Sequence, residues 1–232
     1  MRNLSLCILL FAATALTAQA PGAPSGLTAT SQSDTASSAP ASAPLALPAP
    51  TRTGGMSLNE ALATRRSIRS YTSVQLTMDE ISQLLWSAQG ITGDKGQRTA
   101  PSAHAQYFLR LYVARPEGFF EYIPASHSLK PLSQKDIRAA LSTQDVVKNA
   151  PVVFLIAGEY ERAAKITQRE VSQRLVNLEA GHAAQNMLLQ ATALKLGAVS
   201  VGGVDAKQTA QAAALPADIG AIYLIPVGHP KP

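Results

Sequence analysis

Residues 169–196 read REVSQRLVNLEAGHAAQNMLLQATALKL and form the longest helical pattern in the chain. Gly197 follows, a residue that commonly ends helices. Beyond Ala180 the segment is apolar on almost every side, which is typical of a helix buried on most of its surface. A polar stripe remains at helical spacing, made of Glu179, His182, Asn186 and Gln190. Because buried polar groups need partners, we expect this stripe to face a cofactor, a second subunit or both.

A metal site is not expected at this helix. His182 has no second histidine or carboxylate at ligand spacing in a recognisable set, so we interpret it as a core histidine. The only cysteine, Cys7, lies in the leader described below, which excludes a disulfide framework and a cysteine metal site.

Two capping boxes mark helix starts earlier in the chain. Ser57–Glu60 predicts a short helix that ends at a basic stretch, and Thr77–Glu80 predicts a second helix that closes at Gly90. Trp86 in this second helix is interpreted as a core residue. Further helices are predicted over 133–141 and 205–213. Strands are predicted over 107–114, 119–123, 129–132, 151–157, 198–201 and 221–227. The apolar run 151–157 is expected to be a buried central strand.

The basic stretch after the first helix reads TRRSIRSYT over residues 64–72. Arginine presents five donors in a rigid fork, so Arg65, Ser67 and Arg69 would converge on one phosphate if the backbone there is extended. The alternative is a solvated helix end, where arginines complement the helix dipole and bind nothing. A second candidate is the strand that runs into Gly202 and Gly203, whose backbone amides could face an anion or a ring.

The composition favours one packed domain and argues against a nucleic-acid partner. Of the 232 residues 46% are hydrophobic and 15% are charged, and the formal net charge is +5. Only the basic stretch concentrates cations, and no basic run is interleaved with aromatic residues. We therefore expect no nucleic-acid ligand.

The beginning of the chain predicts export. Residues 1–20 combine a positive start, a short apolar core and a small-residue cleavage signature, which indicates a secretory signal peptide. Residues 21–55 are rich in Ala, Ser, Thr and Pro and are predicted to be a disordered tether. The folded domain is expected over 56–232, in the periplasm or secreted, with membrane contact only through the transient signal peptide.

Five stretches, taken in order, resemble the FMN-dependent nitroreductase family, in particular its SagB-type dehydrogenase branch. They are RRSIRSY at 65–71, RTAPSA at 98–103, EAGHAAQN at 179–186, GAVSVGG at 197–203 and IPVGHP at 225–230. The resemblance implies an α+β homodimer with a central, mostly antiparallel sheet flanked by helices and a long central dimer helix. It also implies two FMN sites at the subunit interface, with NAD(P)H as the usual hydride donor.

The resemblance also implies which residues bind FMN. The phosphate end would be held by the basic stretch, and the ring by the 98–106 loop and the diglycine. The implied cofactor-binding residues are Arg65, Arg66, Ser67, Arg69, Pro101, Ser102, Ala103, His104, Gln106, Gly202 and Gly203. The flavin would carry the chemistry, so no catalytic side chain is expected.

The loop departs from the branch at His104, Gln106 and Phe108, where glycine, leucine and proline are expected, so it is bulkier and more polar. The favoured function is an exported FMN oxidoreductase that acts on a small electrophile such as a nitroaromatic or a quinone. Two alternatives remain, a catalytically silent flavin-binding module and an azoline dehydrogenase of peptide maturation.

Overall fold

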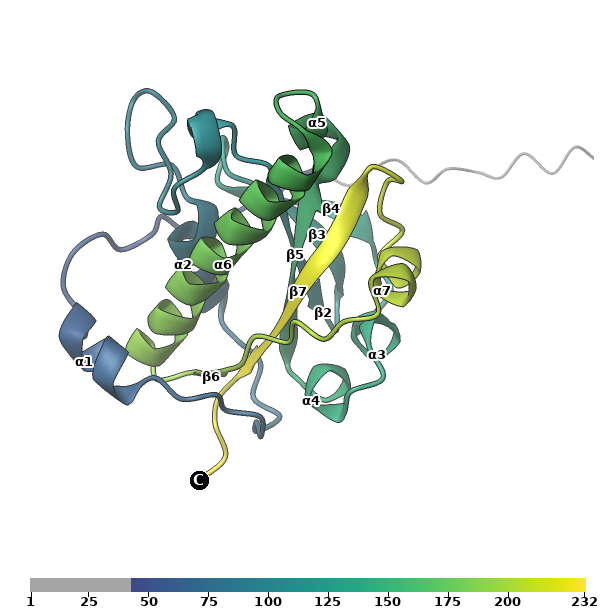
Figure 1. Cartoon of the computed structure of the whole chain (residues 1–232). Coiled ribbons are helices and arrows are strands. Elements are labelled where there is room, and N and C mark those ends of the chain that lie inside the picture. Colours follow the sequence, from purple (N-terminus) through teal and green to yellow (C-terminus); the bar gives the residue numbers. More distant parts are fainter. Residues whose placement is uncertain (1–42) are drawn as a thin grey trace, which may run out of the picture. The chain divides into compact units, whose positions relative to one another are not determined.

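A sheet of seven strands runs through the part of the chain that the computed structural model describes, residues 43–232 (Figure 1). Its strands are β1 (Leu45–Ala46), β2 (Leu109–Arg115), β3 (Gly118–Ile123), β4 (Ser128–Ser133), β5 (Val152–Glu159), β6 (Gly197–Ala198) and β7 (Ile219–Gly228). They lie in the order β1-β4-β3-β2-β5-β7-β6, and every neighbouring pair is antiparallel. The predicted α+β fold with an antiparallel sheet is confirmed.

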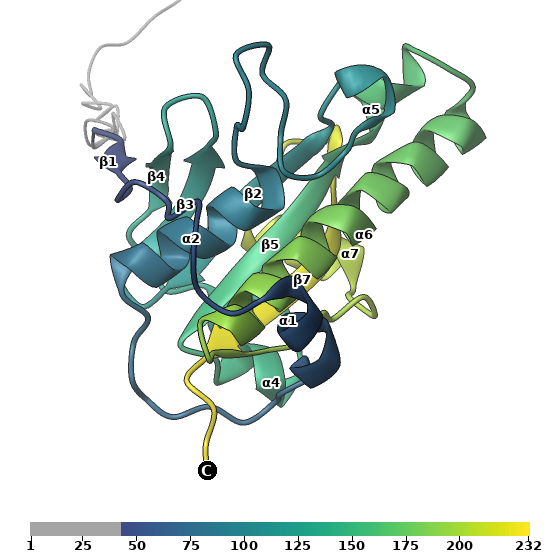
Figure 2. The same ribbon diagram turned by 90° about the vertical axis from the view of Figure 1, so that its left-hand side faces the viewer.

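Helices cover both faces of the sheet. They are α1 (Leu58–Thr64), α2 (Met78–Gln89), α3 (Arg138–Leu141), α4 (Asp145–Lys148), α5 (Tyr160–Ala164), α6 (Arg169–Ala193) and α7 (Ala206–Ala212), with a 3-10 turn η1 at Ala103–Ala105. The helices α2 and α6 lie on one face, and α3, α4 and α7 lie on the other (Figures 1 and 2). The sheet is therefore the middle of three layers.

Strand β5 connects the two cores because its side chains alternate between the faces. Phe154 and Ile156 belong to the core under α2 and α6, whereas Val153 and Leu155 belong to the core under α3, α4 and α7. All four are at most 1% exposed. The predicted buried central strand is thus present.

Three predicted elements differ from the structure. The helix expected over 133–141 begins only at Arg138, because Ser133 pairs with Phe119 in the sheet. The strand expected from residue 107 begins at Leu109, because Tyr107 has a left-handed backbone with φ of 52°. The strand expected over 198–201 is reduced to β6 and a one-residue bridge between Val201 and Leu224. The short helices α4 and α5 had no clear pattern.

The face of α6 that points away from the sheet is more open than its sequence predicts. Leu178 is 53% exposed, and His182 and Gln185 are exposed as well. A helix buried on most sides is therefore wrong for the single chain. Neither α6 nor another helix within residues 43–232 is long and apolar enough to cross a bilayer.

The folded domain begins earlier than residue 56. Leu45 pairs with Leu129, and Leu47 is buried, with its N–H donating to His127 O at 3.1 Å. Pro48 O accepts a hydrogen bond from Ser82 Oγ at 2.6 Å. The predicted tether is wrong for residues 45–51, because their backbone groups find partners on β4, on His127 before it and on α2. Residues 1–42, with the predicted signal peptide and the beginning of the predicted tether, lie outside the described residues.

Replacing Leu47 by alanine should lower the free energy of unfolding by about 2 kcal/mol or more, because a buried leucine leaves a cavity. Leu45, two residues earlier and 46% exposed, provides the matched control, and Leu45→Ala should cost clearly less. Urea denaturation of the three proteins would measure the difference. Equal losses for the two variants would show that residues 43–50 are not anchored by Leu47.

Candidate functional site

The basic stretch runs beside the end of the sheet. Arg65 follows α1 with an extended backbone, φ of −54° and ψ of 127°. Ser67 then forms a parallel bridge with Ala198, and Ile68 N donates to Ala198 O at 3.1 Å. The backbone has thus left the helix at Arg65 and pairs with β6 at Ser67, as the phosphate hypothesis requires. If the alternation continues to Arg69, then Arg65, Ser67 and Arg69 share one side.

Ile68 and Tyr71 fix the position of this stretch. A side chain at Gly197 would lie 2.6 Å from Ile68 Cγ2, so only glycine permits this close approach. The buried Tyr71 places its hydroxyl 2.7 Å from Ile68 O and 3.1 Å from Pro226 O. Burial raises the pKa of Tyr71, so the hydroxyl stays a donor. The cations are therefore carried by a segment that is anchored to β6 and β7.

The three arginines of the basic stretch differ in the hydrogen bonds that they form. Arg66 Nη1 donates to Ala63 O at 3.0 Å and to Arg65 O at 2.7 Å, which caps the end of α1. The solvated helix end foreseen as an alternative therefore describes Arg66. No arginine of the stretch has a carboxylate within 4.0 Å among residues 43–232. Arg65, Ser67 and Arg69 remain as a donor set that fits a phosphate.

The diglycine lies farther along the same path. The four residue steps from Ala198 to Gly202 span about 13 Å in an extended chain. Val201 pairs with Leu224 through both of its backbone groups. Beyond it, the N–H groups of Gly202 and Gly203 have no acceptor in the described part of the chain. Gly202 borders a cavity of about 330 Å³ whose lining includes Tyr160, Asn177 and Tyr223. Two successive free amides of this kind can face an anion or a ring.

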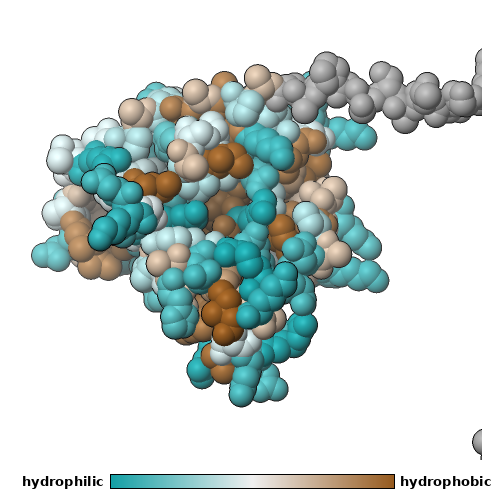
Figure 3. All heavy atoms as spheres, turned by 90° about the horizontal axis from the view of Figure 1, so that it is seen from above, coloured by the Kyte–Doolittle hydropathy of each residue, from teal (hydrophilic) through white to brown (hydrophobic). Residues whose placement is uncertain are grey.

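The 98–106 loop lies against the middle of α6. Ser102 Oγ donates to Glu179 Oε2 at 2.6 Å, and Asn186 Nδ2 donates to Thr99 O at 3.2 Å. The remaining predicted residues of the loop lie at or near its surface, with Ala103 partly covered and Pro101, His104 and Gln106 exposed. Seen from above, this end of the molecule is mostly hydrophilic, with scattered hydrophobic patches (Figure 3).

The structure does not bring all predicted residues together within one chain. The loop is tied to α6 at Glu179 and Asn186, whereas the basic stretch lies beside β6, which follows the end of the helix at Ala193. Along the helix, Ala193 lies about 21 Å from Glu179 and about 10 Å from Asn186. The basic stretch and the diglycine both adjoin β6, and the loop contacts the middle of α6.

Most residues of the polar stripe on α6 form hydrogen bonds within the chain. Glu179 binds Ser102, Asn186 binds the loop, and Gln190 Oε1 accepts from Gln83 Nε2 at 3.3 Å. These three residues thus have partners within the chain, and the expectation that the stripe also faces a cofactor or a second subunit stays a prediction. His182 is exposed and is not the core histidine we expected. Among residues 43–232 there is no group of three or more His, Cys, Asp or Glu suited to a metal.

Sequence reasoning missed the network around Glu179. Arg98 Nη1 donates to Gln89 Oε1 at 2.9 Å, and Gln89 Nε2 donates to Glu179 Oε1 at 3.4 Å. Glu179 is 2% exposed, and burial raises the pKa of its carboxyl, although the bonds from Ser102 and Phe108 N oppose that shift. The only sequence signal was a carboxylate on a helix that otherwise looked apolar.

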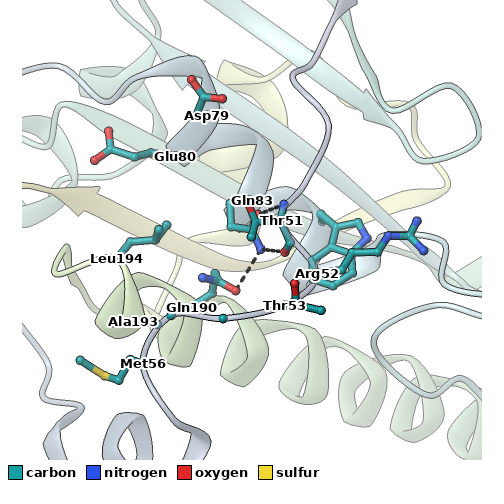
Figure 4. Close-up of a pocket in the computed structure, with 13 residues that line it drawn as sticks. Thr51, Arg52, Thr53, Met56, Asp79, Glu80, Gln83, Gln190, Ala193 and Leu194 are labelled. Carbon is teal, nitrogen blue, oxygen red and sulfur yellow. Dashed lines mark hydrogen bonds between the residues drawn. The ribbon is translucent and has the colours of Figure 1, made fainter.

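A separate cavity of about 360 Å³ lies between residues 51–56, α2 and α6 (Figure 4). Gln83 forms its polar wall, accepting from Thr51 N at 2.8 Å and donating to Thr51 O at 3.0 Å. Trp86, expected in the core, is half-buried at its edge. None of the predicted site residues lines this cavity, so it is distinct from the candidate site.

The stability of the protein should depend on pH through Glu179. Its folded-state pKa lies above the ordinary value of 4.5, so the native state binds more protons than the unfolded state as pH rises past that value. Stability contributed by this group should then fall with rising pH. Unfolding measured between about pH 4 and 7 on wild type and Glu179→Gln should show the wild type losing stability relative to the variant. A difference that grows in favour of wild type would contradict this sign.

Comparison with known proteins gives consistent results. Residues 62–229 match the family model described as Nitroreductase family. A protein of Methanocaldococcus jannaschii with the provisional name nitroreductase is 39% identical over 155 residues, which cover 62% of this chain and 78% of that protein. The FMN reductase (NADPH) of Bacillus subtilis is 24% identical over 184 residues, covering 74% of this chain and 65% of that protein.

A crystal structure from Ralstonia eutropha, also provisionally named a nitroreductase, has a TM-score of 0.77 at 30% identity. The similarity covers 82% of this chain and 90% of that chain.

Proposed function

Because this chain belongs to the nitroreductase family, we propose that it is an FMN-dependent oxidoreductase that transfers hydride between NAD(P)H and a small electrophile. A flavin-linked oxidoreductase is the general activity that the family and the relatives support. The observation that carries the proposal in this chain is the donor set of Arg65, Ser67 and Arg69, which is anchored to the sheet and has no internal anion. The B. subtilis relative, named for FMN and NADPH, supports the choice of cofactor and donor.

The proposed FMN would be held at two places along one path. Arg65, Ser67 and Arg69 would bind the phosphate, and the N–H groups of Gly202 and Gly203 would face the ring. When bound, the flavin supplies the hydride chemistry, so the protein needs to bind, orient and shield it. The cavity beside the diglycine leaves space next to that ring for a flat electrophile such as a nitroaromatic or a quinone.

A homodimer would complete the site. In one chain Ser102 is tied to the middle of α6 and the basic stretch lies beyond its end, so a second copy would supply the part of the loop that faces the ring. Apolar side chains suited to such a contact are exposed on two helices, at Leu58, Leu62 and Leu178. Burying them between two copies would remove them from water.

Two further parts of the proposal rest on sequence alone. Export follows from the secretory signature at residues 1–20, outside the described part of the chain. The SagB-type branch stays a prediction. The alternative of a catalytically silent flavin-binding module is based on His104, a bulky residue with a left-handed backbone in the 98–106 loop. Reduction of the bound flavin by NADH or NADPH distinguishes an enzyme from this silent module.

Replacing Arg65 or Arg69 by alanine should weaken FMN binding roughly tenfold to a hundredfold, because a charge-assisted contact contributes about 1.5–3 kcal/mol. Riboflavin, which lacks the phosphate, should bind more weakly and change little in either variant. Arg52→Ala is the matched control, since Arg52 is exposed and lies outside the basic stretch. Arg66→Ala should have a smaller effect because Arg66 caps α1.

The test is a flavin titration of each protein with both ligands, followed by anaerobic addition of NADH or NADPH to the FMN complex. Bleaching of the visible flavin band is expected. Equal affinity for FMN and riboflavin would remove the phosphate site. Tight FMN binding without bleaching by either nicotinamide would favour the silent module.

Light scattering of the FMN complex should return twice the mass of the mature chain, because the proposed flavin site needs residues from two copies. Leu178→Glu should weaken the dimer, since it places charge on the exposed face of α6. Lys130→Glu, on an exposed strand position away from α6, is the control. A monomer that retains FMN at micromolar protein would contradict the shared site.

A further inference from the structure

Residues 102–108 form a strained loop. His104, Ala105 and Tyr107 each have φ of 52°, in the left-handed region that residues with a Cβ rarely adopt. Three such residues within four positions persist only where the surroundings hold them. The question is which groups do so.

Glu179 holds this loop at both ends. Its Oε2 accepts from Ser102 Oγ at 2.6 Å and from Phe108 N at 3.3 Å. Ser102 Oγ in turn accepts from Tyr107 N at 2.8 Å, so its own proton points to the carboxylate. One buried oxygen therefore closes a loop of seven residues, and the strained residues lie between its two contacts.

Each polar group that contacts Glu179 is a donor. Besides Ser102 and Phe108 N, Gln89 Nε2 approaches Oε1 at 3.4 Å, while the oxygen of that amide is occupied by Arg98. The charged groups that act on Glu179 are Arg98 and Arg162, both cations. An ionised carboxylate, which only accepts, matches these surroundings, whereas a protonated or amide group would turn a donor toward donors.

A second tie comes from α5. Arg162 donates to Gln106 O at 3.0 Å and to Tyr107 O at 2.6 Å, and its guanidinium lies 4.8 Å from the centre of the Phe108 ring. It holds the carbonyl groups of the loop, whereas Glu179 holds the N–H groups and the serine. The two contributions can be separated by experiment.

We propose that Glu179 is a positioning residue whose carboxylate keeps residues 102–108 in their left-handed conformation and so sets the shape of the loop that contacts the flavin. The part concerning flavin rests on the proposed function. Burial opposes the charge by raising the pKa of Glu179, so packing alone does not explain a carboxylate here. The donors of the loop lower the pKa and so offset part of this shift without reversing it.

The first test measures the loop without flavin. In hydrogen exchange of the full chain, the amides of Tyr107 and Phe108 should exchange at least about tenfold faster in Glu179→Gln than in wild type. Glu170→Gln makes the same change at an exposed site on the same helix and should behave as wild type. Ser102→Ala keeps the carboxylate and removes one donor, so its loop amides should show a smaller increase in exchange rate. This variant replaces Glu179→Gln in the test if Glu179→Gln does not fold.

Unchanged exchange in both loop variants would overturn the proposal and assign the loop to Arg162. This result is independent of flavin, so it decides the role of Glu179 even if the wild type binds no FMN. The absence of FMN binding would instead refute the proposed function.

The second test measures FMN affinity against pH. Glu179→Gln should bind FMN several-fold more weakly than wild type at neutral pH. Wild-type affinity should fall at acid pH as the carboxyl takes up a proton, and the variant should lack this component. The FMN phosphate titrates near pH 6 in both proteins, so the difference between the two curves isolates Glu179. Faster exchange with parallel affinity curves would overturn the link between Glu179 and the flavin site.

Discussion

The burial of β5 on both faces is the constraint on which the rest of this structure depends. A strand with core on both sides needs a helical layer on each, and α2 and α6 supply one while α3, α4 and α7 supply the other. Because α6 crosses the first face and β6 follows directly from it, the direction of this helix also sets where the sheet edge meets the basic stretch. Core packing thus determines the place of the proposed phosphate site.

Charged groups at two positions along helix α6 have different partners. Near its end, glycine at position 197 lets the basic stretch approach the sheet, and cations are left without internal partners. Near its middle, a buried carboxylate gathers donors from a strained loop. The cations beyond the end of the helix are the proposed ligand site, whereas the carboxylate at its middle binds the protein's own loop. This separation is the reason that the proposed flavin site includes a second copy of the chain.

Local signals predicted much of the fold. Capping residues at Ser57 and Thr77 gave the starts of α1 and α2, and the apolar run at 151–157 gave β5. Contacts between residues far apart in the sequence could not be predicted. Ser133 looked like a helix cap because its pairing with Phe119 is not visible locally. The candidate phosphate residues followed from spacing, whereas Glu179 was placed in a stripe without its partners, since these lie about 70 to 90 residues away in sequence. Whether the predicted residues bind FMN stays a prediction.

The early start of the domain has a consequence for the edge of the sheet. Without β1, strand β4 would be the outer strand, and its backbone groups at Ser128 and Leu129 would be free to pair with another chain. The two residues of β1 cover the beginning of that edge at Ser128 and Leu129, and a strand so short offers little template in its turn. Residues 43–50 therefore shorten the exposed edge of the sheet as well as anchor the chain.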